Sequence, residues 1–184
     1  MPIYFIRHGQ SEFNAVHKDG DSDPLIFDAP LTDKGRRQAE EARLLVADLE
    51  IKQVITSPLT RAIQTALCIF DGITPIEVGA SHRELLLHSC DVGRSPKELQ
   101  QDFPSLSFAH LQNVWWHQGA ENENGVAVEP EDVFLERINA FDRSLTQIRD
   151  RPVAIVGHGN VFRALTGRMM ENCEIHLYTQ ANHD

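Results

Sequence analysis

The chain has 184 residues, 41% of them hydrophobic, which is enough for one domain to bury a sizeable core without disulfide or metal cross-links. Its net charge of −10 disfavours binding to nucleic acid or to anionic lipid, because both ligands are attracted chiefly by Lys and Arg. The 3 cysteines are widely spaced and form no C-x-x-C pair, so we expect neither a disulfide framework nor a zinc site.

Signals for export or membrane insertion are not recognisable in the sequence. Only a few residues precede Arg7, which is too few for the basic and apolar regions of a signal peptide. No later apolar run approaches the length of a membrane-spanning helix. We therefore expect a cytoplasmic protein in a reducing compartment, with no membrane partner.

The apolar run 3–6 predicts a strand that is buried on both faces, and it ends abruptly in Arg7-His8-Gly9. Arg7 is a permanent cation, and His8 can act as a base, a nucleophile or a metal ligand near neutral pH. Gly9 would let the backbone approach a ligand closely. By itself this triplet is as compatible with an ordinary strand end as with a functional site.

Two further apolar runs end in the same way and change that balance. Residues 53–56 lead into a segment that contains Arg61, and residues 152–156 lead into Gly157-His158-Gly159. In a mostly parallel α/β sheet, the loops after the carboxyl ends of the strands form the ligand crevice. Two arginines and two histidines are therefore predicted to meet in one site.

The remaining elements follow from hydrophobic spacing and from turn residues. After a polar loop over 17–29, Thr32 is expected to cap a helix that ends near Glu50, and Pro58 is expected in the first turn of the next helix. A short strand at 76–78, helices at 131–149 and at about 160–169, and an edge strand within 173–179 complete the prediction.

Residues 82–128 carry few periodic segments, although 96–103 and 108–116 could each form a short helix. We interpret this stretch as an excursion inserted into a single domain that spans 1–184, since it lacks a continuous apolar pattern of its own. Excursions of this kind often shape substrate entry. Trp115 and Trp116 could form a lid, but packing of the excursion onto the core is the commoner role for such a pair.

Four motifs, in this order, resemble those of the histidine phosphatase superfamily, which is also called phosphoglycerate mutase-like. They are Arg7-His8-Gly9-Gln10-Ser11 with Asn14, Leu31-Thr32-Asp33-Lys34-Gly35 with Gln38-Ala39, Ser57-Pro58-Leu59-Thr60-Arg61-Ala62 with Thr65-Ala66, and Val156-Gly157-His158-Gly159. The resemblance, to the phosphatase branch, implies a three-layer α/β/α sandwich with a mostly parallel central sheet. It also implies a covalent phosphohistidine mechanism without a metal or organic cofactor.

The resemblance assigns the nucleophile to His8, whose other ring N–H should be held by an acceptor such as a backbone carbonyl. Phosphoryl transfer also needs positive groups and donors around the phosphoryl oxygens, where negative charge resides throughout the reaction. The residues carried over to phosphate binding are Arg7, Asn14, Arg61, His158 and Gly159.

A leaving alkoxide needs a proton, and one carboxylic acid can donate it and later accept a proton from water. Glu84 matches the position of this acid in the family only in part, because His82 stands where a leucine is usual, and Asp91 is the alternative. Glu129-Pro130 is a second departure, since many relatives have glutamate-serine there.

The favoured function is a phosphatase that hydrolyses a small phosphorylated metabolite. By its resemblance to the family, the short chain lacks the long insertions that enclose the substrate in the mutases. The alternatives are a phosphoglycerate mutase, which must keep its intermediate from water, and a phosphohistidine phosphatase acting on proteins or a non-catalytic phosphate-binding protein.

Overall fold

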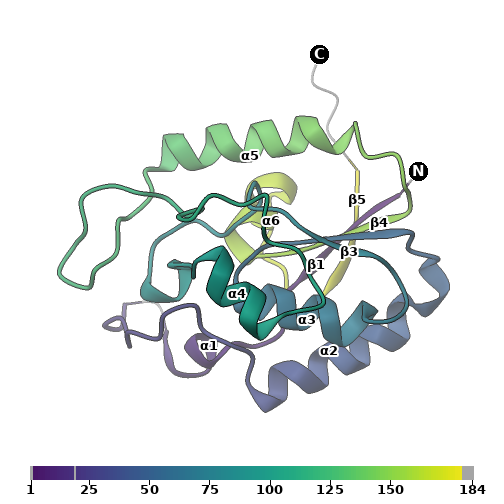
Figure 1. Ribbon diagram of the computed structural model, residues 1–184, viewed down its shortest axis with the longest axis horizontal. Coiled ribbons are helices and arrows are strands. Elements are labelled where there is room, and N and C mark those ends of the chain that lie inside the picture. Colours follow the sequence, from purple (N-terminus) through teal and green to yellow (C-terminus); the bar gives the residue numbers. More distant parts are fainter. Residues whose placement is uncertain (1, 19, 180–184) are drawn as a thin grey trace.

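The computed structural model describes residues 2–18 and 20–179, which form a five-stranded sheet flanked by helices (Figure 1). The strands are β1 (Ile3–Arg7), β2 (Gln53–Thr56), β3 (Ile76–Val78), β4 (Val153–Gly157) and β5 (Ile175–Tyr178), in the order β3-β2-β4-β1-β5. All neighbouring strands are parallel except β5, which pairs antiparallel with β1. The mostly parallel sheet and the edge strand at the end of the chain are both confirmed.

Two layers of helices cover the sheet and complete the α/β/α sandwich. Figure 1 shows α2 (Asp33–Val46) and α3 (Thr60–Phe70) on one side of the strands and α5 (Glu131–Leu145) on the other. Alternate residues of β1 point to opposite layers: Phe5 packs with α5 and α6 (Gly159–Thr166), and Ile6 packs with α2 and α3. Phe5 lies stacked between Phe162 and Tyr178, with ring centroids 4.6 and 4.3 Å away.

Helix ends follow the expected capping chemistry in part. Thr32 accepts a hydrogen bond from the backbone N–H of Gly35 at 3.0 Å, which confirms the predicted cap of α2. The α-helix ends at Val46, and a 3-10 turn, η1 (Ala47–Leu49), carries the chain to Glu50. The predicted helices 131–149 and 160–169 end early, at Leu145 and Thr166; the second stops because Gly167 takes the left-handed conformation.

Pro58 does not lie in the first turn of α3, contrary to the prediction, because the helix begins two residues later at Thr60. Ser57 accepts a weak hydrogen bond from the backbone N–H of Leu59 within the bend that precedes the helix. The cap comes instead from the preceding polar loop, where Asp28 accepts from the backbone N–H and the hydroxyl of Thr60 at 2.8 and 2.5 Å.

The excursion 82–128 contains the 3-10 turn η2 (Ser89–Asp91) and α4 (Pro96–Asp102), close to the predicted helix 96–103. The predicted helix 108–116 is absent, because tertiary contacts hold that stretch irregular: His110 bonds the carbonyl of Val78 at 2.7 Å, and Trp115 donates to the carbonyl of Arg94 at 2.8 Å. Trp115 packs in the cluster formed with α3 and β3, as expected of a packing residue. The division into one domain with an inserted excursion stays a prediction.

A short helix that sequence reasoning missed, α1 (Glu12–Val16), follows β1 directly. Ser11 caps it by accepting from the backbone N–H of Asn14 at 3.1 Å, and Asn14 returns the bond by accepting from the backbone N–H of Ser11 at 3.3 Å. The helix therefore places Asn14 next to the end of β1.

Candidate active site

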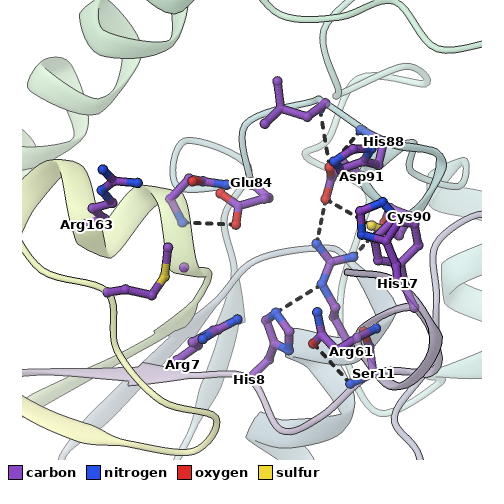
Figure 2. Close-up of a pocket in the computed structure, with 16 residues that line it drawn as sticks. Arg7, His8, Ser11, His17, Arg61, Glu84, His88, Cys90, Asp91 and Arg163 are labelled. Atoms are coloured by element: carbon purple, nitrogen blue, oxygen red, sulfur yellow. Dashed lines mark hydrogen bonds and ion pairs between the residues drawn. The ribbon is translucent and has the colours of Figure 1, made fainter. Parts of the chain in front are cut away.

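A cavity of about 350 Å³ opens beside the carboxyl ends of β1 and β4, where the sequence placed the site. Figure 2 shows His8 and Arg61 at its base, with Glu84 and Asp91 on separate sides above them. Seven of the eight predicted site or alternative residues line it: Arg7, His8, Asn14, Arg61, Glu84, Asp91 and Gly159. The eighth, His158, is fully buried behind the wall, with its ring centroid 5.3 Å from that of His8.

His8 is buried and is held in one tautomer by the backbone. Its Nδ1 lies 2.7 Å from the carbonyl oxygen of Gly9, so Nδ1–H donates there and Nε2 keeps its lone pair. Burial, reinforced by the charges of Arg61 and Arg7, lowers the pKa of His8 well below its ordinary value. The ring is therefore neutral near pH 7, with Nε2 as the atom that can attack.

Gly9 packs closely against α2, and its expected approach to a ligand stays a prediction. A Cβ at Gly9 would lie 2.4 Å from the carbonyl oxygen of Gly35 in α2, so the loop after β1 fits only with glycine there. The backbone N–H of Gly9 donates to the hydroxyl of Thr65 in α3 at 3.1 Å. Residues of two motifs thus fix the loop that carries His8.

Arg61 stands in the first turn of α3 and uses all three of its nitrogens. Nε donates to Nε2 of His8 at 3.2 Å, Nη1 to the carbonyl of Cys90 at 2.6 Å, and Nη2 to Asp91 at 2.8 Å. The other oxygen of Asp91 accepts from the backbone N–H groups of Leu87 and His88. Asp91 is therefore the buried counter-ion of Arg61, with both of its oxygens occupied.

Two further cationic or donor groups lie close to His8. Arg7 donates through Nη1 to the carbonyl of Met170 at 2.5 Å, while its Nε has no partner among the described residues. His158 Nε2 lies 2.7 Å from the hydroxyl of Ser57. The same hydroxyl accepts a weak hydrogen bond from the backbone N–H of Leu59 at 3.4 Å. In the described structure Nδ1 of His158 is buried and has no partner.

Glu84 is buried, and each of its oxygens accepts one backbone hydrogen bond, from Leu85 at 2.9 Å and from Asn160 at 3.1 Å. Burial, together with the neighbouring charge of Asp91, raises the pKa of Glu84. No described cation is paired with this carboxyl. Glu84 is therefore an acid that retains its proton at higher pH than an ordinary glutamate.

Sequence reasoning missed several contributors to the pocket. Ser57 belongs to a recognised motif, but its bond to His158 depends on the approach of β2 and β4. The backbone N–H of Asn160 carries no sequence signal. The rim residues Phe13, His17, His88 and Arg163 come from three separate segments, and no spacing relates them.

No group of three or more His, Cys, Asp or Glu side chains is placed to hold a metal ion within residues 2–18 and 20–179. Within the same residues, no helix is long and apolar enough to cross a membrane. The positive charge next to His8 is provided by the guanidinium groups of Arg7 and Arg61.

The family model described as histidine phosphatase superfamily (branch 1) matches residues 3–184. The chain therefore belongs to the histidine phosphatase superfamily. Its relatives include phosphoglycerate mutase-like phosphatases, which agrees with the resemblance seen in the four motifs.

Two curated relatives illustrate the range of names. A glucosyl-3-phosphoglycerate phosphatase of Mycolicibacterium vanbaalenii is 28% identical over 91% of this chain and 73% of its own length. The chain is 31% identical to a protein of Cronobacter sakazakii named probable phosphoglycerate mutase GpmB, but this match covers 68% of the chain and only 47% of that relative.

Solved structures confirm the fold. Bacillus stearothermophilus YhfR matches with a TM-score of 0.60 and 25% identity, over 90% of this chain and 78% of that one. A mycobacterial glucosyl-3-phosphoglycerate phosphatase, Rv2419c, solved in complex with VO3, matches with a TM-score of 0.60 and 20% identity, over 95% and 88% of the two chains.

Proposed function

We propose that this protein is a metal-independent phosphatase that hydrolyses a small-molecule phosphomonoester through a covalent phosphohistidine on His8. The observation that carries the proposal is the state of the His8 ring. Its Nδ1–H is held by the Gly9 carbonyl, its pKa is lowered, and its Nε2 faces a buried guanidinium. A neutral imidazole beside fixed positive charge is the nucleophile that attack on a phosphate dianion requires.

The chemistry proceeds in two displacements. Nε2 of His8 attacks phosphorus, the bond from phosphorus to the ester oxygen breaks, and Glu84 gives its proton to that oxygen. Water then attacks the phosphohistidine, its proton passes to the Glu84 carboxylate, and the bond to Nε2 breaks to release inorganic phosphate. Both partners return to their starting protonation states.

The phosphoryl oxygens are assigned to donors on three sides of His8. Arg7 and Arg61 supply guanidinium groups, and Arg61 exchanges its bond to Nε2 for a phosphoryl oxygen when substrate arrives. Asn14 and His158 Nδ1 supply neutral donors, and the backbone at Gly159, at the start of α6, adds a helix N-terminus.

The acid role is assigned to Glu84 rather than to Asp91 because the two carboxyls have opposite environments. Asp91 is paired with Arg61 through one oxygen, and its other oxygen accepts from two backbone N–H groups, so neither oxygen is open to a leaving group. Glu84 has a raised pKa and lines the same cavity. Only Glu84 is suited to donate a proton to the leaving group.

The size of the cavity and the names of the relatives support a small-molecule substrate. A volume of about 350 Å³ lies in the range of pockets that hold small ligands. Relatives over most of the chain are named as phosphatases of glucosyl-3-phosphoglycerate and of adenosylcobalamin/alpha-ribazole. Phosphoglycerate mutase is the second candidate, because two relatives that match in part are named probable phosphoglycerate mutases.

The test is a screen of phosphorylated metabolites with the purified protein, in the presence and absence of a strong chelator, with phosphoglycerate mutase activity measured in parallel. We expect release of inorganic phosphate that chelation leaves unchanged, and competitive inhibition by vanadate. Phosphoryl transfer between positions of phosphoglycerate, faster than hydrolysis, would show a mutase. Tight phosphate binding without turnover would show a non-catalytic binding protein, and activity on a phosphohistidine protein alone would show a protein phosphatase.

A further inference from the structure

A buried network of ion pairs lies behind the segment that carries Glu84, and its residues do not line the active-site cavity. Glu129 has a side chain with 0% exposure, and it accepts from Arg137 at 3.1 and 2.7 Å, one bond to each carboxylate oxygen. Arg83 adds a third bond, to Oε1 at 2.9 Å. One carboxylate thus holds two arginines, and Arg137 meets it with the two-pronged geometry that is the strongest for such pairs.

Arg137 also holds the backbone on both sides of Glu84. Its Nη1 donates to the carbonyls of Ser81 at 3.0 Å and Arg83 at 2.9 Å, and its Nη2 lies 3.5 Å from the carbonyl of Glu84 itself. The stretch 79–88 contains no helix or strand, so these carbonyls have no ladder partners. A guanidinium on α5 therefore replaces the secondary structure that would otherwise fix this backbone.

Glu129 also binds the backbone on the C-terminal side of Glu84, at Leu86. Its backbone N–H donates to the carbonyl of Leu86 at 2.8 Å, and its carboxylate lies 3.5 Å from the backbone N–H of the same residue. Five of the six peptide units between Ser81 and Leu87 therefore contact Glu129 or Arg137. The Glu84 side chain points the other way, into the cavity, as Figure 2 shows.

We propose that Glu129 and Arg137 are positioning residues that set where the Glu84 carboxyl stands relative to the leaving-group oxygen. This inference rests on the proposed function, in which Glu84 is the proton donor. A displacement of about 1 Å in a catalytic group can cost on the order of 10²-fold in rate. The network acts on the proton transfer alone, because neither residue contacts His8 or its phosphate-binding partners.

The experiment measures the variants Glu129→Gln and Glu84→Gln on two substrates, an alkyl phosphate and an aryl phosphate. Glu129→Gln keeps the size of the side chain and removes the charge that holds both arginines. We expect kcat/KM for an alkyl phosphate such as β-glycerol phosphate to fall by roughly 10- to 100-fold. For p-nitrophenyl phosphate, whose leaving group needs no proton, we expect a change of less than about threefold.

The second arm is a double-mutant cycle. Once Glu84→Gln has removed the acid, its position no longer matters, so adding Glu129→Gln should cost the alkyl substrate less than about a further threefold. Glu131→Gln, an exposed neighbour at the start of α5, is the matched control and should leave both substrates unchanged. Vanadate affinity should be the same in Glu129→Gln and Glu131→Gln as in the wild type, because neither residue contacts His8 or its phosphate-binding partners.

Arg137→Lys is a second test of the same network, for use if Glu129→Gln does not fold. Lysine keeps a buried cation but cannot bind the carboxylate and the three carbonyls at once. It should show the same selective loss on the alkyl substrate. Equal losses on both substrates, or losses that multiply with Glu84→Gln, would overturn the positioning role and leave a structural one. If Glu84→Gln itself affects both substrates equally, the acid role of Glu84 fails, and this inference fails with it.

Discussion

The two ends of the candidate pocket are built in different ways. The phosphate end lies on regular structure: His8 follows β1, Arg61 lies in the first turn of α3, and His158 precedes α6. The proposed leaving-group end lies on an irregular stretch, in which Glu84 and Asp91 are held by side chains of α3 and α5 and by a backbone N–H of α6. Both ends are buried and hydrogen-bonded, but only the first is placed by sheet geometry.

This structural difference matches the two proposed roles, which are phosphate binding at one end of the pocket and contact with the leaving group at the other. Phosphate has the same shape in every substrate, so a rigid arrangement at strand ends suits it, whereas leaving groups differ between substrates. A loop that is held by individual side chains can differ in sequence between proteins with different substrates, while the proposed phosphate end stays the same. The predictions below separate the two ends, beginning with the largest effect.

Removal of the proposed nucleophile should abolish turnover but leave oxyanion binding at the proposed phosphate end intact. For His8→Ala we expect kcat to fall by ~10⁴-fold or more, since the substitution removes the ring that forms the covalent intermediate in the proposed mechanism. Vanadate should still bind, because Arg7, Arg61 and His158 remain. Acid-quench labelling and vanadate titration measure the two properties. His176→Ala, on the exposed edge strand β5, is the control, and label retained in His8→Ala would contradict the assignment.

Loss of the acid should depend on the leaving group and on pH. Glu84→Gln should slow an alkyl phosphate by ~10²–10⁴-fold and an aryl phosphate much less. In the wild type the protonated form is required, so the rate on the alkyl substrate falls as pH rises through the raised pKa of Glu84. That alkaline limb should disappear in Glu84→Gln. A pH–rate profile for both substrates checks this, and an unchanged limb would assign it to another group.

Asp91→Asn should behave as a defect of the phosphate end, although Asp91 lies on the irregular stretch. It leaves Arg61 buried without its counter-ion, which should cost about 3 kcal/mol of unfolding free energy and weaken vanadate binding. Turnover of alkyl and aryl phosphates should fall by the same factor. Asp102→Asn is the control, because its pair with Arg94 is largely exposed and should be worth less than about 1 kcal/mol. A leaving-group dependence in Asp91→Asn would transfer the acid role to Asp91.

His82→Leu should have the smallest effect at neutral pH and should alter stability rather than catalysis. His82 Nδ1 is buried without a partner in the described structure, and the Val156 carbonyl that Nε2 meets also accepts from Ser57. Leucine should therefore fit at little cost.

The difference should grow as pH falls. Burial lowers the pKa of His82 to about 4, so the folded protein keeps the ring neutral while the unfolded chain protonates it below its ordinary value of 6.5. Wild type thus loses stability from pH 6.5 down to 4, by up to about 3 kcal/mol from this residue, and His82→Leu lacks that loss. Urea unfolding at pH 7 and pH 5 measures it, and equal losses in both proteins would contradict the argument.

Several parts of this protein could be predicted from the sequence because they depend on local pattern. Apolar runs of strand length gave β1, β2 and β4, and the rule that parallel strands end at one edge placed Arg7, His8 and Arg61 together. The tautomer of His8 also followed, since an attacking ring needs its other N–H held. The limits of α3 and the absent helix 108–116 could not be predicted, because Asp28, Arg94 and Val78 act on them from distant segments.

The sequence by itself determined the sheet, the family and the convergence of Arg7, His8 and Arg61, because each depends on residues adjacent in the chain or on strand-end geometry. Only the tertiary structure distinguished Glu84 from Asp91. The two carboxylates are chemically alike and stand in one loop. The burial of Glu84 against two backbone N–H groups and the pairing of Asp91 with Arg61 arise only when β3, α3 and α6 come together.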